Sequence, residues 1–391
     1  MNRTSAPFRV GILFSRNGVT STIESSQLQA TIFAIDEINE RGGIDGREIK
    51  PIYYDPCSSP GNYKTLAEKL LSDDGVRVIL GCYMSSTRKA VLPIVERWNG
   101  LLMYPTLYEG FEYSRNVIYT GAAPNQNSVR LAEYMMQKFG SRVYLVGSDY
   151  VYPYESNRIM TEVVLEHGGQ RIAERYVPLD ATAKDFAPIV DDIRNKRPDF
   201  IFSTVVGDAT AHLYRSYADA GLDAATMPIA SLTTSEAEVA AMGADIAAGH
   251  ITAATYFQSI QTERNRSCVE NFKRRFGSDS VTNMCWEAAY FQTYLMASAL
   301  RATGSDNIQA LLPALLGLEF SAPQGTVKID AENHHSYLTP RIGRIRADGQ
   351  FEILDESPIP VRPDPYLVAH SLEDWSSRAT PVLRTSKANR G

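Results

Sequence analysis

No set of reactive side chains in this sequence matches the spacing of a familiar catalytic site. Residues 86–89 fit the Ser-x-x-Lys pattern of penicillin-recognising enzymes, but the Lys-Thr-Gly element that accompanies it there is absent. The sequence also lacks a Gly-x-Ser-x-Gly nucleophile elbow and the glycine-rich loops Gly-x-Gly-x-x-Gly and Gly-x-x-x-x-Gly-Lys that cradle phosphates. We therefore expect no catalytic residue and no cofactor, and we interpret the protein as a non-enzyme.

The histidines and cysteines are not spaced as metal ligands. The six histidines show no His-x-x-x-His spacing and the four cysteines no Cys-x-x-Cys spacing, while the adjacent His334 and His335 point opposite ways in an extended chain. We predict no metal site. Cys57 and Cys82 follow the second and third expected strands, so the sequence allows either a disulfide between them, which indicates an oxidising compartment, or two free thiols.

The chemistry that the sequence does offer is hydrogen bonding by hydroxyl and phenol groups. Such groups follow five expected strands, in segments 82–87, 104–108, 147–154, 204–208 and 231–235. Open α/β sheets bind ligands at the carboxyl ends of their strands. Ser85 or Ser235 alone is best interpreted as a helix N-cap, but five strand ends of the same chemical kind favour a binding site.

Hydroxyls, backbone amides and aromatic walls suit a small neutral ligand that has both donor and acceptor groups. We expect an amide or urea carbonyl to accept from Ser85, Thr106 and local N–H groups, and its NH₂ group to donate to oxygens on the facing lobe. A zwitterionic amino acid needs a counter-charge for its ammonium group. Asp149, Asp208 and Glu236 are acids near these strand ends, and one that points inward would weaken the prediction of a neutral ligand.

Strand-like and helix-like segments alternate along much of the chain, which predicts the α/β class with mostly parallel sheets flanked by helices. The expected strands are 8–14, 49–54, 76–81, 101–104, 117–120, 142–147, 171–177, 200–204, 228–232 and 250–256. The expected helices are 24–40, 62–71, 88–98, 128–138, 155–167, 185–195 and 209–218.

Two such runs, ending near Gly121 and Tyr256, predict two lobes. Three helical patterns follow at 263–276, 286–303 and 307–316, and then antiparallel strands at 325–329, 341–346 and 351–354, the last two joined by an Asp-Gly turn. We predict a first lobe of residues 1–121 and 256–325, a second lobe of residues 122–255 and 326–356, and an extended C-terminal strap and tail at 357–391. Several crossovers then form a hinge, and the ligand binds between the lobes.

The composition is typical of a water-soluble globular protein. The 391 residues are 44% hydrophobic and 21% charged, with 39 Lys and Arg against 45 Asp and Glu, a net charge of −6. An acidic protein does not attract phosphate backbones, and no apolar run is long enough to span a bilayer, so we expect neither direct nucleic-acid binding nor membrane insertion. Residues 1–7 lead directly into the first strand without a signal-peptide cleavage site, which predicts a cytoplasmic protein unless an export signal has been removed.

The chain resembles the type I periplasmic-binding-protein family from Val10 to about Trp375. The resemblance rests on residues 81–85 with 88–91, 104–106 with 108–110, 123–127, 147–150, 203–207, 231–239 and 362–366. Within the family the chain is most similar to AmiC-type amide sensors, the negative regulators of aliphatic amidase operons. It is also similar to the urea- and short-chain-amide-binding components of ABC transporters.

The resemblance implies a two-lobed clamshell that closes on an acetamide-like ligand without altering it. The residues that it assigns to the ligand are Ser85, Tyr104 and Thr106 on the first lobe, Tyr150, Tyr152 and Thr233 on the second, and Tyr83 in the wall. A sensor of this kind sequesters an RNA-binding antiterminator until its inducer binds. The alternative is an exported substrate-binding protein that serves an ABC permease for urea or short-chain amides.

Some features of the chain are closer to the exported relatives. A Cys57–Cys82 pair resembles the disulfide of exported amino-acid-binding relatives, and residues 332–335 and 346–351 are similar to the urea-binding transporter components. These features weigh against a cytoplasmic location. The choice among acetamide, butyramide, urea and formamide stays open, and both a monomer and a homo-oligomer are compatible with the sequence.

Overall fold

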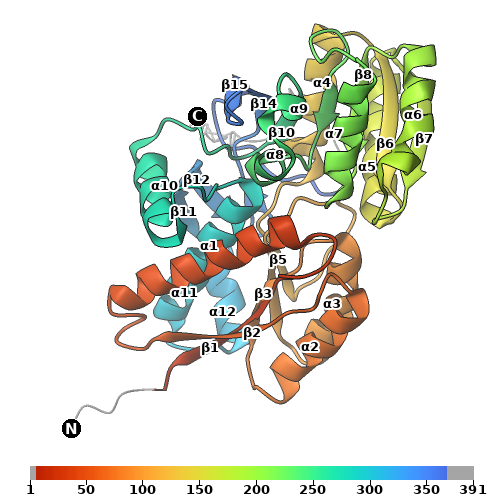
Figure 1. The fold of residues 1–391 in the computed structure, drawn as a ribbon. Coiled ribbons are helices and arrows are strands. Elements are labelled where there is room, and N and C mark those ends of the chain that lie inside the picture. Colours follow the sequence, from red (N-terminus) through yellow and green to blue (C-terminus); the bar gives the residue numbers. More distant parts are fainter. Residues whose placement is uncertain (1–5, 368–391) are drawn as a thin grey trace, which may run out of the picture.

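The structure, a computed structural model, describes residues 6–367 and folds them into two α/β bodies (Figure 1). Its strands form sheets of five, seven and three strands. We call the body built on the five-stranded sheet the first lobe and the body built on the seven-stranded sheet the second lobe. The α/β class and the two-lobed architecture predicted from the sequence are confirmed.

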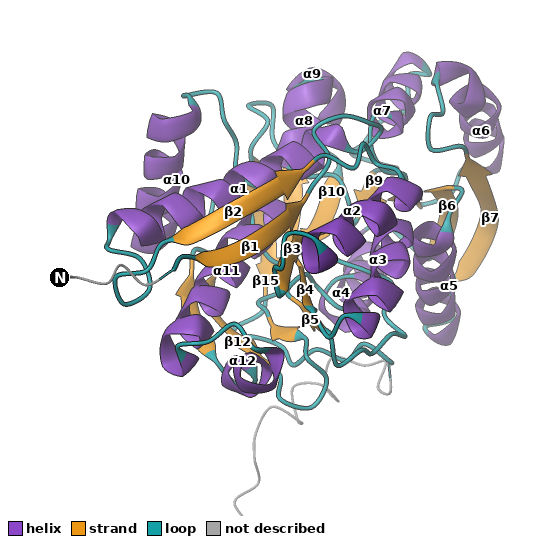
Figure 2. Cartoon of the chain, turned by 90° about the horizontal axis from the view of Figure 1, so that it is seen from below, coloured by secondary structure: helices purple, strands orange, loops and turns teal. Residues whose placement is uncertain are grey.

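The sheet of the first lobe is parallel throughout, in the order β2-β1-β3-β4-β5. Its strands are β1 (Phe8–Leu13), β2 (Ile49–Tyr54), β3 (Val78–Gly81), β4 (Leu101–Tyr104) and β5 (Val117–Tyr119). Its helices are α1 (Ser21–Glu40), α2 (Pro60–Ser72) and α3 (Ser85–Arg97). Side chains alternate between the faces, so Ile12 packs in the same core as Ile35 of α1, and Leu13 in the core under α2 and α3. Figure 2 shows α2 and α3 side by side next to this sheet.

The sheet of the second lobe has the order β15-β14-β10-β9-β8-β6-β7, with two antiparallel strands at one edge. Its strands are β6 (Arg142–Ser148), β7 (Gln170–Val177), β8 (Phe200–Thr204), β9 (Ile229–Ser231), β10 (Ile251–Ala254), β14 (Arg341–Ile345) and β15 (Phe351–Glu356). Its helices are α4 (Ser128–Lys138), α5 (Val151–Glu166), α6 (Ala183–Lys196), α7 (Ala209–Asp219), α8 (Glu236–Met242) and α9 (Ala244–Ala247), preceded by the short helix η1 (Pro124–Gln126). The predicted hairpin at Asp348-Gly349 joins β14 to β15.

A third, antiparallel sheet lies between the C-terminal helices and the strap. It consists of β11 (Glu319–Ala322), β12 (Gly325–Ile329) and β13 (Ser336–Tyr337), and the neighbouring helices are α10 (Glu263–Phe276), α11 (Met284–Thr303) and α12 (Ile308–Leu315). The sequence did not predict a separate sheet here. β12 is the central strand and pairs with both β11 and β13, so residues 325–329 join this sheet and not the sheet of the second lobe. The predicted lobe boundaries stay a prediction.

The predicted strap is described as far as Leu367, and residues 368–391 lie outside the described part of the chain. Val361 pairs with Leu338 in an isolated antiparallel bridge, and Gln126 donates from Nε2 to the Val361 carbonyl at 2.8 Å. The strap therefore ties the third sheet to the segment that enters the second lobe.

All four cysteines are free, so a Cys57–Cys82 disulfide is not formed. Cys57 is exposed in a loop, whereas Cys82 is buried beneath the first lobe's sheet, which leaves the alternative of two free thiols. Among residues 6–367, no three His, Cys, Asp or Glu side chains cluster as metal ligands would. None of the helices in that range has the length and hydrophobicity to cross a bilayer.

The two lobes touch where the loop before α1 meets the loop after β8. The amide of Asp208 donates to the Val19 carbonyl at 3.3 Å. Gly207 has a φ of +68°, and a Cβ atom there would lie 2.2 Å from the Val19 carbonyl oxygen. Because that carbonyl belongs to the other lobe, this close approach depends on a residue without a side chain.

We predict that Gly207→Ala opens the molecule. Gly221→Ala is the matched control, because Gly221 has the same φ of +68° but open space around its Cβ position, so both variants bear a backbone penalty of about 1 kcal/mol. Small-angle X-ray scattering should show a larger radius of gyration for Gly207→Ala than for Gly221→Ala. Equal radii would mean that the Val19–Gly207 approach does not hold the lobes together.

Candidate functional site

The ends of five strands meet at one cavity between the lobes. Eight residues line it: Tyr83, Ser85, Thr106 and Leu107 from the first lobe, and Tyr150, Tyr152, Val206 and Thr233 from the second. Every one of the five polar strand ends singled out in the sequence contributes at least one of them. Six of the seven predicted ligand residues therefore lie together, and their role in binding stays a prediction.

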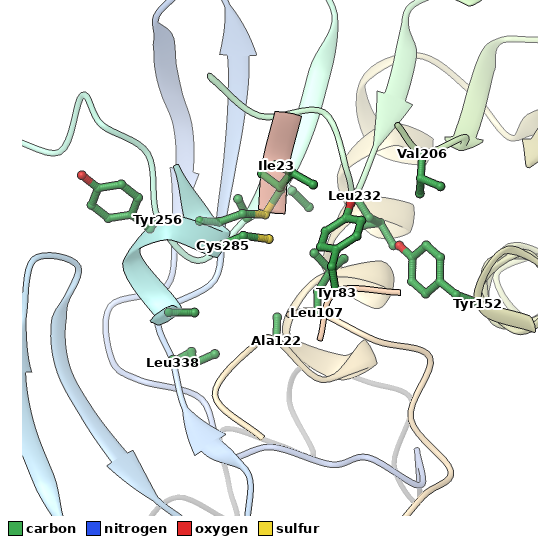
Figure 3. Close-up of a cluster of buried hydrophobic side chains, with 14 of the residues drawn as sticks. Ile23, Tyr83, Leu107, Ala122, Tyr152, Val206, Leu232, Tyr256, Cys285 and Leu338 are labelled. Carbon is green, nitrogen blue, oxygen red and sulfur yellow. The ribbon is translucent and has the colours of Figure 1, made fainter. Parts of the chain in front are cut away.

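The cavity is small, and its lining residues are buried except for Tyr150, which is partly exposed. The space in which the centre of a water molecule fits is about 10 Å³, which is near the minimum that holds one water. Figure 3 shows Tyr83, Leu107, Tyr152 and Val206 gathered with other buried side chains at this point. As it stands, the cavity has room for about one water molecule, so any larger guest requires its walls to move.

A buried ion network lies behind the first-lobe wall. Arg88 of α3 is fully buried and binds Glu109 at 3.1 Å and Glu112 at 2.8 Å, and Lys89 binds Glu112 at 3.0 Å. Burial by itself would raise the pKa of Glu112, but Arg88 and Lys89 lower it to about 2. The lysine of the Ser-x-x-Lys pattern is thus a partner of this network.

Ser85, the first residue of α3, connects this network to the cavity. Its hydroxyl donates to the Glu109 carboxylate and accepts from Arg88 Nη1 at 3.1 Å. The sequence pointed to Ser85 but not to the roles of Arg88 and Glu109, because the partners lie more than twenty residues apart and only the folded loop after β4 brings them together.

Thr106 is held by a helix that the sequence analysis did not connect with the site. Gln27 of α1 donates from Nε2 to the Thr106 hydroxyl at 3.0 Å and to the Pro105 carbonyl at 3.1 Å. The Thr106 hydroxyl in turn donates to the Cys82 carbonyl at 3.3 Å. Gln27 is fully buried, and a lone glutamine in an amphipathic helix carries no sequence signal for such a contact.

Tyr104 lies outside the cavity lining, contrary to the direct ligand contact that the resemblance implied. Its hydroxyl donates to the Tyr83 carbonyl at 2.6 Å, and its ring lies 4.8 Å from the Arg88 guanidinium. Tyr104 packs with Leu13 and Tyr63 in the core under α2 and α3, because alternation along β4 turns it away from the cleft. It supports Tyr83 and Arg88 from behind.

The second-lobe wall contains a fully buried hydroxyl that makes no hydrogen bond, that of Tyr152. Thr233 donates to the Val205 carbonyl at 3.0 Å. The Tyr152 hydroxyl is buried without a hydrogen-bond partner. Burial raises the pKa of both Tyr150 and Tyr152, so their phenols stay neutral at physiological pH.

The three acids named in the sequence analysis do not line the cavity. Asp149 and Asp208 are exposed, and Asp149 accepts from the Tyr154 hydroxyl at 2.8 Å. Glu236 is buried and accepts from the Gln258 amide at 2.7 Å, and burial raises its pKa to about 8. The cavity therefore offers no carboxylate to an ammonium group, and it is lined by uncharged side chains alone.

The family model of the periplasmic binding protein domain matches residues 8–372. The Leu/Ile/Val-binding protein homolog 6 of Brucella suis is 26% identical over 321 residues, which cover 78% of this chain and 82% of that protein. Among solved structures, an ABC transporter solute-binding protein from Rhodopseudomonas palustris HaA2, in complex with p-hydroxybenzoic acid, superposes with a TM-score of 0.84 at 21% identity and covers 94% of this chain and all of that one.

A second solved structure has the same fold with another guest. The branched-chain amino acid transporter substrate-binding protein of Streptococcus pneumoniae, in complex with isoleucine, gives a TM-score of 0.78 at 15% identity and covers 90% of this chain and 99% of that one. At such identities the two structures establish the shared fold, whereas the family model covers nearly the whole chain. The chain belongs to the type I periplasmic binding protein family.

Proposed function

We propose that this protein is a non-catalytic, exported substrate-binding protein that takes up a small neutral amide or urea between its lobes and presents it to an ABC permease. The observation that carries this proposal is the closed cavity of hydroxyl, phenol and aliphatic side chains, with no charged group in its lining. We assign six residues to the contact with the guest, and Tyr104 supports them from behind. The six are Tyr83, Ser85, Thr106, Tyr150, Tyr152 and Thr233.

The guests in the two related structures differ from the one we propose. Isoleucine and p-hydroxybenzoic acid both carry a carboxylate at neutral pH, and a buried carboxylate requires a cation or several N–H donors. Arg88 is the nearest candidate, but Glu109 and Glu112 already neutralise it. The small volume of the cavity also favours a guest with fewer heavy atoms than either compound.

We prefer a role in import to the role of a cytoplasmic sensor that the sequence analysis put first. The solved structures described above are of a solute-binding protein of an ABC transporter and a substrate-binding protein of a branched-chain amino acid transporter. A cytoplasmic amide sensor that sequesters an antiterminator is the second candidate, and the four free thiols favour it, because reducing compartments keep cysteines unpaired. Fractionation of cells that express the native gene separates the two, since the importer component is released with the periplasm and the sensor stays in the cytosol.

The proposed ligand class is tested by titration calorimetry of the purified protein. We expect acetamide or urea to bind, and leucine and 4-hydroxybenzoate to produce no heat, because neither fits the closed cavity or finds a partner for its charge. Thermal shift gives an independent readout, since a ligand that prefers the folded state raises the melting temperature. Tight binding of leucine with no response to acetamide or urea would refute the proposal.

We predict that Thr106→Val weakens amide binding by about tenfold to a hundredfold, that is, about 1–3 kcal/mol, because valine has a similar shape but no hydroxyl. Thr120→Val is the matched control. Thr120 is equally buried and donates to Gln292 at 2.9 Å, but it does not line the cavity. Calorimetry should show a loss of affinity in the first variant only, and equal affinities in both would remove Thr106 from the binding site.

A further inference from the structure

We infer that the cavity binds its guest in one orientation, with the guest's carbonyl oxygen on Tyr152 and its NH₂ group on the hydroxyl oxygens of Ser85 and Thr106. This inference rests on the proposed function and adds to it the orientation of the bound guest. The orientation is the reverse of the one expected from the sequence, where the carbonyl was to accept from Ser85 and Thr106.

The hydrogens of the three aliphatic hydroxyls in the lining all point into the protein. Ser85 donates to the Glu109 carboxylate, Thr106 to the Cys82 carbonyl and Thr233 to the Val205 carbonyl. A carboxylate paired with arginine and a backbone carbonyl can only accept hydrogen bonds. The direction of each of these three bonds is therefore fixed, and none of the hydrogens is left for a guest.

Each first-lobe hydroxyl keeps one acceptor position. A hydroxyl oxygen has two lone pairs. Arg88 Nη1 occupies one lone pair of Ser85 at 3.1 Å, and Gln27 Nε2 occupies one of Thr106 at 3.0 Å. Gln27 cannot be turned around to accept instead, because the same nitrogen donates to the Pro105 carbonyl. The Ser85 and Thr106 hydroxyls thus present acceptors to the guest.

Tyr152 of the second-lobe wall supplies a donor. The Tyr152 hydroxyl lines the cavity, is buried and has no partner. An unpaired buried hydroxyl is unfavourable, and a carbonyl oxygen placed against it would remove the penalty. Since donor and acceptors lie on opposite lobes, a guest that bridges them couples binding to closure.

The class of guest that fits this arrangement of one donor and two acceptors is a carboxamide or a urea. Both have a carbonyl for Tyr152 and an NH₂ group for the hydroxyl oxygens, whereas acetate has the shape of acetamide but no N–H to donate. Glu109 acts as a positioning residue: by accepting from Ser85, it keeps the Ser85 hydrogen away from the guest. Without this contact, Ser85 could turn and donate to a carboxylate.

The orientation is tested by NMR of acetamide labelled with ¹³C at the carbonyl and with ¹⁵N, bound to the full-length protein. We expect Tyr152→Phe to shift the bound carbonyl resonance upfield and to weaken binding about tenfold. Ser85→Ala should shift the amide nitrogen and leave the carbonyl in place. Tyr144→Phe is the control, because Tyr144 is a buried tyrosine of the same lobe whose hydroxyl binds Asp192 at 2.9 Å, outside the cavity.

The opposite pattern, in which Ser85→Ala moves the carbonyl and Tyr152→Phe moves only the nitrogen, would overturn the inference and leave the proposed function intact. Competition between acetate and acetamide for the wild-type protein tests the same arrangement of donor and acceptors without any variant. Acetate should bind at least a hundredfold more weakly than acetamide, and equal affinity would overturn the inference. Failure of both acetamide and urea to bind the wild type would overturn the proposed function, and the inference with it.

Discussion

The buried ion pair between Arg88 and the two glutamates of the loop after β4 is the interaction on which the site depends. It joins α3, which carries Ser85, to the loop that carries Thr106, and so sets the first-lobe wall. Removing one member of such a buried network typically costs about 3–5 kcal/mol, because the partner charge is left unpaired. Glu109 and Glu112 together balance Arg88 and Lys89, so the network adds rigidity without giving the cavity a charge.

The cavity exists only where both lobes meet, and this ties its chemistry to the closure of the molecule. Val19 and Gly207 approach each other across the lobes, and Arg158 of α5 lies 5.0 Å over the ring of Phe111 in the first-lobe loop. A guest that contacts both walls binds the closed form better than the open one, which is the condition for a ligand to shift the balance between them. Tyr152, whose hydroxyl is buried and unpaired, is the residue to which we assign that preference.

Much of the fold could be predicted from the sequence, because long periodic segments dominate it. The expected helices 128–138 and 263–276 have the bounds of α4 and α10, and the polar ends of five strands do meet at one cavity. Short elements such as α8 and β11 were not predicted, since they are too brief to show a period. The resemblance takes no account of alternation along β4, which turns Tyr104 toward the core under α2 and α3. Gln27 was missed because its partner, Thr106, is 79 residues away.

The direction of the hydrogen bonds could not be predicted from residue types alone. A serine or threonine both donates and accepts, and only its partners in the fold decide which group remains for a guest. Here the backbone carbonyls and the Glu109 carboxylate make that choice. A lining that looks merely polar in the sequence thus contains two hydroxyl acceptors, Ser85 and Thr106, that face the unpaired phenol of Tyr152.

The most direct measurement is a high-resolution crystal structure of the protein with its guest bound. The account predicts an uncharged amide or urea between the lobes, with its carbonyl oxygen within hydrogen-bond distance of the Tyr152 hydroxyl and no charged side chain in contact with it. An amino acid in the cleft with its ammonium on an acidic side chain, or a carboxylate held by a freed Arg88, would contradict it.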